Sequence, residues 1–249
     1  MKKGLRLWAV LFWLLVWQLG SMALGSEILL VSPVRVIETL AGMVVQAQFW
    51  RSVGFSLIRI FGGFLLGALL GSLLAALSSR FRIIRELFSP LVLTIRTVPV
   101  ASFIILALIW FSSRNLSILI SFLMVLPIIY TGVLSGIGER DRGLMEMAHV
   151  FHVRRMRRFL MIDLPGVYPY FHSACKTALG LSWKSGIAAE VIGMPRGSIG
   201  EHMQQAKVYL DTPSLFAWTV VIVLVSLLCE RLVLHGMDLG MKTLRRWKG

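Results

Sequence analysis

Among the charged side chains inside stretches that are otherwise apolar, Arg96, Lys184 and Glu190 are the candidates for a functional role. A charge inside such a membrane-like stretch is costly, so each is a candidate for contact with a solute or an ion. Arg96 comes shortly before Pro99, which has no amide hydrogen and would loosen or kink a helix there. For Arg96, a long side chain that reaches out to the membrane surface is an equally open alternative.

Lys184 and Glu190 are poor partners for each other on one helix. They are six residues apart, which is about 240° around an α-helix, so they point to different faces. Each charge therefore needs a partner on another helix or a water-filled cavity. We expect Lys184 to contact an anionic solute, because it is a cation, and Glu190 to have a structural role at a helix or subunit contact. Solute contact is the alternative for Glu190.

The sequence contains no set of residues that would support enzyme chemistry. The sequence has no G-x-x-x-x-G-K-[ST] phosphate loop, so this chain is not expected to hydrolyse ATP. No Ser/His/Asp set or pair of carboxylates is placed for hydrolysis. Cys175 and Cys229 lie in apolar stretches without the spacing of metal ligands. We therefore expect no catalytic residue, no metal site and no cofactor in this chain.

The composition is that of an integral membrane protein. Of 249 residues, 57% are hydrophobic and only 15% are charged, a balance that soluble domains do not have. The net charge is +14, but the basic residues lie mainly between the apolar runs rather than on one face. Such charges suit anionic lipid beside the membrane and do not indicate nucleic acid.

The apolar runs predict a single all-α membrane domain, 1–249, with six transmembrane helices. The predicted spans are 7–24, 53–77, 88–111, 116–134, 174–192 and 214–234. The first run could instead be a signal peptide, because Ala23-Leu24-Gly25 resembles a cleavage site. Six spans place both termini on one side of the membrane. That side has 16 Lys and Arg residues against 5 on the other, which predicts cytoplasmic termini.

Three glycines, Gly63, Gly67 and Gly71, recur at four-residue spacing inside the second predicted span. They place a smooth groove on one face of the helix, where another helix can approach closely. We expect this groove to serve packing within one subunit, and a seam between two subunits is the alternative.

The long polar interruption at 136–169 is predicted to lie in the cytoplasm. Apolar residues recur in it at helical spacing: Leu144, Met147, Ala148 and Phe151, then Met156, Phe159 and Leu160. This spacing predicts two short amphipathic helices outside the bilayer, which Pro165 and Pro169 are expected to end. An apolar face outside the membrane needs a partner to cover it.

Two segments of this loop, Glu146-Met147-Ala148 and Ile162-Asp163-Leu164-Pro165, have the spacing of a known motif. They resemble the EAA motif of ABC importer permeases, E-A-A-x3-G-x9-I-x-L-P, with Met147 in place of an alanine and His152 in place of the glycine. Further stretches resemble the nitrate/sulfonate/taurine branch of these permeases: 32–33, 96–101, 189–193, 197–200 and 215–218. The resemblance covers nearly the whole chain.

The resemblance implies the membrane subunit of an ATP-driven importer with the type I fold, in the cytoplasmic membrane of a prokaryote. The implied partners are a second permease copy in a homodimer, two ATPase subunits that use ATP and Mg, and an extracytoplasmic binding protein. The implied solute is a small anion such as a sulfonate or nitrate, and a vitamin precursor is the alternative. The hypothesis from another class is an ion-coupled carrier or channel that acts without an ATPase.

In such a permease the loop would seat in a cleft of the ATPase and transmit its movement. The implied coupling residues are Leu144, Glu146, Met147, Ala148, Phe151, His152, Ile162, Leu164 and Pro165. The apolar members would be buried at this contact, and Glu146 would pair with a basic group.

His152 stands where the motif has a glycine, which permits a turn through positive φ. Histidine adopts that conformation more readily than branched residues do, so we expect the turn between the two helices to survive. A smoother helix is the alternative at His152, and a helix lying on the membrane surface is the alternative for the whole loop.

Overall fold

The structure, a computed structural model, describes residues 7–26 and 29–246. Every regular element in these ranges is a helix, as the composition predicts. The elements are α1 (Leu7–Leu24), α2 (Pro33–Val44), α3 (Ala47–Arg80), α4 (Arg82–Thr97), α5 (Val100–Trp110), α6 (Ser113–Gly138), α7 (Arg142–Val150), α8 (Arg155–Arg158), the π-helix η1 (Phe159–Asp163), α9 (Leu164–Gly193), α10 (Ile199–Val208) and α11 (Thr212–Arg246). Lys2, Lys3, Arg6 and Lys248, which entered the count of basic residues, lie outside the described residues.

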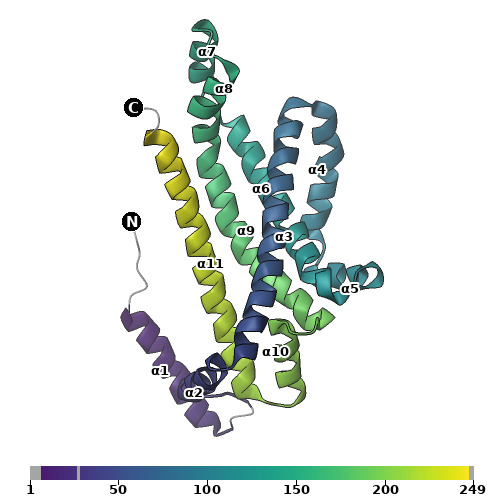
Figure 1. The fold of residues 1–249 in the computed structure, drawn as a ribbon, viewed down its shortest axis with the longest axis vertical. Helices are drawn as coiled ribbons and strands as arrows, with labels where there is room; N and C mark the ends of the chain where they lie inside the picture. Colours follow the sequence, from purple (N-terminus) through teal and green to yellow (C-terminus); the bar gives the residue numbers. More distant parts are fainter. Residues whose placement is uncertain (1–6, 27–28, 247–249) are drawn as a thin grey trace.

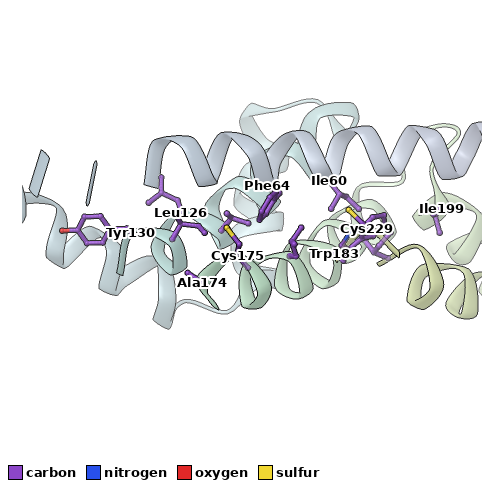
Figure 2. Close-up of a cluster of buried hydrophobic side chains, with 14 of the residues drawn as sticks. Ile60, Phe64, Leu126, Tyr130, Ala174, Cys175, Trp183, Ile199 and Cys229 are labelled. Atoms are coloured by element: carbon purple, nitrogen blue, oxygen red, sulfur yellow. The ribbon is translucent and has the colours of Figure 1, made fainter. Parts of the chain in front are cut away.

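The helices α3, α6 and α9 form the centre of the bundle and pack against one another extensively. Figure 2 shows Phe64 of α3 and Leu126 of α6 in one buried cluster with Cys175 and Trp183 of α9. Trp183 is almost completely buried, and α11 adds Cys229 to the same cluster. Burial of these apolar side chains holds α9 between its neighbours and fixes which of its faces remain open.

The glycine groove of α3 faces α6 of the same chain. A Cβ at Gly67 would lie 2.8 Å from Val125 Cβ, and one at Gly71 would lie 2.9 Å from the carbonyl oxygen of Leu126. The two backbones are thus closer than any side chain at these positions would permit. The expected packing within one subunit is confirmed, and the groove is not free to form a seam with a second copy.

The predicted span at 88–111 is two helices in the structure. α4 begins earlier, at Arg82, and ends at Thr97, and α5 starts directly after Pro99, which is its N-cap residue. The two helices are bent by 106°. The sequence predicts a kink here because Pro99 lacks the amide hydrogen, but the structure has a sharp corner instead of a kinked span.

Within residues 7–26 and 29–246, three helices are long and apolar enough to cross a membrane: α3, α6 and α11 over 212–243. The bent pair α4 and α5 makes a fourth if it is counted as one span, and the apolar part of α1 is shorter. α9 has 30 residues, with Lys176, Lys184 and Glu190 interrupting its apolar sequence.

The two ends of the bundle differ, as Figure 1 shows. α7 and α8 project beyond the other helices at one end, whereas α1, α2 and α10 lie at the opposite end. α3, α9 and α11 run between the two ends. The loop singled out in the sequence is therefore separated by the length of the bundle from α10.

Pro165 and Pro169 do not end the amphipathic helices, contrary to the sequence-based expectation. Pro165 lies in the first turn of α9, and Pro169 lies inside the same helix. Helical conformation continues from η1 into α9, so neither proline ends a helix here. The loop between α6 and α9 is consequently shorter than 136–169 and spans residues 139–163.

Candidate coupling loop and polar groove

The projecting loop is organised by α7. Asp141 is its N-cap residue, and its side chain accepts hydrogen bonds from the backbone amides of Gly143 at 2.8 Å and Leu144 at 3.3 Å. Such a cap satisfies amide hydrogens that a helix start otherwise leaves unpaired. The short helix therefore begins at a fixed residue, although it lies outside the packed bundle.

The apolar face of α7 is largely uncovered. Phe151 is 73% exposed, Met147 47% and Leu144 43%, whereas Ala148 is buried against its own chain. Three of the four predicted contact residues are thus available to a partner. Ala148 is not, because its side chain is covered by the chain itself. Exposed large apolar side chains on a projecting helix mark a contact surface for another protein or for the membrane.

Glu146 lies on the same helix and is exposed. It forms no ion pair with any residue that the structure describes. The carboxylate is therefore available to a cation outside the chain.

The turn after α7 forms without the glycine of the motif. His152 has φ 47°, which is the left-handed conformation predicted from the glycine that the EAA motif has at this position. Its amide donates to His149 O at 3.1 Å, and the Val153 amide donates to Ala148 O at 3.0 Å. These two bonds make a Schellman motif, in which the left-handed residue satisfies the last carbonyl groups of the helix. The alternative of a smoother helix at His152 is excluded.

The remaining motif residues lie where the loop joins α9. Ile162 belongs to η1, and Leu164 and Pro165 begin α9; all three are partly buried. Asp163 lies between Ile162 and Leu164 and is buried. It forms an ion pair with Arg140, and this pair was not predicted from the sequence. Its signal in the sequence is an acidic residue flanked by Ile162 and Leu164 and close to a run of arginines.

A polar groove runs along α6 and α9. It consists of two adjoining cavities of about 390 and 400 Å³, which share Ile128, Thr131 and Thr177. One cavity continues to Arg96 and to the corner between α4 and α5, and the other adds Ser135, Tyr170 and Ser173 among its lining residues. The groove thus combines hydroxyl groups and one cation with apolar lining residues.

Lys184 lies on the face of α9 that lines this groove. Thr177, Leu181 and Lys184 have i, i+4, i+7 spacing, which places them along one side of a helix, and the first two line the cavity of Arg96. Both Arg96 and Lys184 are exposed, and neither forms an ion pair within the described part of the chain. Pro99 makes the corner, but its neighbours Val98 and Val100 line the cavity.

Glu190 does not line this groove, and its side chain is fully buried. Ser56 of α3 donates a hydrogen bond to its Oε2 at 2.6 Å, and the Gly200 amide donates to the same oxygen at 3.4 Å. The carboxylate therefore lies at the N-terminus of α10, where the helix dipole favours a negative charge. A Cβ at Gly200 would overlap the backbone of Glu190, so only glycine allows this approach.

In the described part of the chain, an all-helical bundle with membrane-length apolar helices and a projecting amphipathic loop is typical of an integral membrane protein. The chain belongs to the family of binding-protein-dependent transport system inner membrane components, whose model matches residues 52–235. It is therefore a multi-pass permease of the inner membrane.

Curated relatives agree with this family. The chain is 30% identical to a probable ABC transporter permease protein of Brucella melitensis, over 84% of this chain and 85% of that protein. It is 27% identical to a putative aliphatic sulfonates transport permease protein of Bacillus subtilis, over 93% and 83% of the two chains. It is 26% identical to the taurine transport system permease protein of Escherichia coli, over 94% and 85%. The resemblance to the nitrate/sulfonate/taurine branch is confirmed.

Proposed function

We propose that two copies of this chain form the membrane part of an ABC importer that carries a small anion, such as a sulfonate, into the cell. A separate pair of ATPase subunits hydrolyses ATP with Mg, and an extracytoplasmic binding protein delivers the solute. The observation behind the anion is a pair of cations at the groove of α6 and α9: Arg96 lines one cavity, and Lys184 lies one turn beyond its lining residue Leu181 on the same side of α9. Neither cation has an ion-pair partner among the described residues. A second copy facing this groove would enclose it.

The proposed topology has six crossings with both termini in the cytoplasm. The crossings are α1, α3, the pair α4 and α5, α6, α9 and α11. The excess of basic residues on the side of α7 and α8 supports it. A cysteine in place of Tyr209, which is exposed beyond α10, should react with an impermeant maleimide in intact cells, and one in place of Met147 should not. The opposite labelling pattern would invert the topology.

The proposed coupling contact is the uncovered face of α7. Leu144, Met147 and Phe151 enter a cleft of the ATPase, and Glu146 pairs with a basic group at its rim. A carrier or channel that acts without an ATPase has no use for such a face, so the exposed side chains favour the importer. The solute class rests on the two cations of the groove and on the aliphatic sulfonates and taurine in the names of the relatives.

Replacing Lys184 by alanine tests the anion path. We expect about a ten-fold lower uptake rate at saturating amounts of loaded binding protein, because a charge-assisted contact with the solute is lost. The measurement is uptake of taurine and of short aliphatic sulfonates into proteoliposomes that contain the permease, its ATPase and its binding protein. Lys184→Arg keeps the charge and should retain most of the uptake.

Lys176→Ala is the matched control for this experiment. Lys176 is another exposed lysine of α9, and like Lys184 it is not itself a lining residue of either cavity. It lies about 80° around the helix from Lys184, off the side that carries Thr177 and Leu181. Equal losses in the two alanine variants, or unchanged uptake in Lys184→Ala, would remove Lys184 from the path.

A further inference from the structure

An ion pair closes the base of the projecting loop. Arg140 follows the end of α6, and Asp163 directly precedes α9. The Arg140 Nη1 atom donates a hydrogen bond to Asp163 Oδ1 at 2.6 Å, across 23 residues of chain. The Asp163 side chain is 12% exposed and that of Arg140 is 28% exposed, so the pair is largely shielded from water. Shielding strengthens a pair of this kind relative to one at an open surface.

The same arginine is fixed to α6 by a second bond. Its Nε donates to the carbonyl oxygen of Ile137 at 2.8 Å, in the last turn of that helix. The carbonyl groups of a last turn have no partner within the helix, so a guanidinium there satisfies one of them. One planar side chain therefore connects the end of α6 to the residue that leads into α9.

Asp163 also lies near a second cation. Arg158 Nε is 3.7 Å from Asp163 Oδ2, so the carboxylate sits between Arg140 and Arg158. The Arg158 side chain is 40% exposed, which makes it the weaker partner. Loss of Arg140 would leave Asp163 beside Arg158, whereas loss of the Asp163 charge would leave both arginines without their acceptor.

A π-helical turn brings Asp163 to this place. η1 joins α8 to α9 without a break in helical conformation, and the Leu164 amide donates to Phe159 O, five residues back. A π-turn inserts one extra residue into a helix and changes the direction of the side chains before it. The loop thus enters α9 as continuous helix, and its two ends are joined by the ion pair.

We propose that the Arg140–Asp163 pair is a clasp that makes α6 and α9 move together when the coupling loop is displaced. α7 lies within the loop that the clasp closes, so a force on α7 reaches both helices at one fixed point. Without the clasp, the loop would pivot at its two ends and absorb part of the displacement. Arg140 and Asp163 are positioning residues in this scheme, which rests on the proposed contact of α7 with an ATPase.

The test follows the polar groove while the ATPase works. Thr177 lines both cavities and is exposed, so a cysteine there reports on access to the groove. Its maleimide labelling rate is measured in the complete complex with ATP and without nucleotide, beside the rate of ATP hydrolysis. The chain without the added cysteine gives the background, because Cys175 and Cys229 are buried.

We expect Asp163→Asn to remove most of the ATP-dependent change in labelling while ATP hydrolysis continues. Arg140→Gln should show a similar loss, because Arg158 precedes η1 on the same continuous helix as Asp163 and cannot join it to α6. The double variant should be no worse than Asp163→Asn alone, since both substitutions break one interaction. Additive losses would contradict a single clasp.

Glu86→Gln is the matched control, because it breaks the exposed Arg82–Glu86 pair, whose side chains are 89% and 63% exposed. It should leave labelling and hydrolysis unchanged. A full ATP-dependent change in Asp163→Asn would overturn the clasp. If Asp163→Asn does not assemble with the ATPase, Arg140→Gln provides the test. A full ATP-dependent change in labelling in Arg140→Gln overturns the clasp, and a reduced change at a normal rate of ATP hydrolysis supports it. No ATP-dependent change in the chain that carries only the cysteine at Thr177 would instead overturn the proposed function, and the clasp with it.

Discussion

Replacing Glu146 by lysine should abolish ATP-driven uptake while the chain still inserts into the membrane. Glu146 is exposed on α7 and has no ion-pair partner among the described residues, so the change leaves the fold intact. A lysine there would face the basic group proposed on the ATPase, and like charges at an interface cost about 3 kcal/mol or more. A loss of this size weakens the binding of the ATPase to the permease about a hundred-fold. Co-purification of the ATPase with a tagged permease and uptake in proteoliposomes measure the two effects.

Glu139→Lys is the control for the charge change. Glu139 is also exposed and lies in the same loop, but it precedes α7 and is separated from its apolar face. It should assemble and transport normally. Normal uptake by Glu146→Lys would remove Glu146 from the contact, and a failure of both variants would indicate a general intolerance of positive charge in the loop.

Replacing Gly63 by leucine should destabilise the fold strongly. A Cβ at this position would overlap the carbonyl oxygen of Ile118 and lie 2.8 Å from Ser121 Cβ. Backbone cannot move aside as a flexible side chain can, so α3 and α6 must separate. We expect a loss of about 3 kcal/mol in the free energy of unfolding, at the upper end for an overpacked core. Thermal unfolding of the detergent-solubilised chain measures it.

The neighbouring glycine provides the control. Gly62 has no atom within 4 Å of a Cβ placed on it, so Gly62→Leu changes the same residue type in the same helix without a clash. It should be neutral or slightly stabilising, because leucine favours a helix more than glycine does. Equal destabilisation of the two variants would contradict the close contact of α3 with α6.

Some features of the fold follow from single residues in the sequence. Gly63, Gly67 and Gly71 predict the close helix contact, because their spacing repeats once per turn and only a glycine lets two backbones meet. Pro99 predicts the break in the third apolar run. At His152 the turn is predicted from the position of a glycine in the motif, and its φ of 47° confirms it.

Other features depend on tertiary contacts that no local pattern contains. A proline predicts a break but no angle, because the 106° between α4 and α5 is set by what α5 packs against. Pro165 was expected to end a helix, although the same residue type also begins helices. The pairing of Asp163 with Arg140 joins residues far apart in sequence, and several arginines of the loop were equally plausible partners. The sequence predicts a structural role for Glu190, but not that its carboxylate accepts a hydrogen bond from the Gly200 amide at the start of α10.

α9 is one uninterrupted helix, and an acidic group is fixed at each end of it. Asp163 precedes its first residue, and Glu190 lies in its last turn against α10. Thirty residues of α-helix measure about 45 Å. A tilt of about 5° around the Asp163 end would carry the Glu190 end sideways by about 4 Å over that length. Small angular changes at one end of α9 thus become displacements of atomic size at the other end.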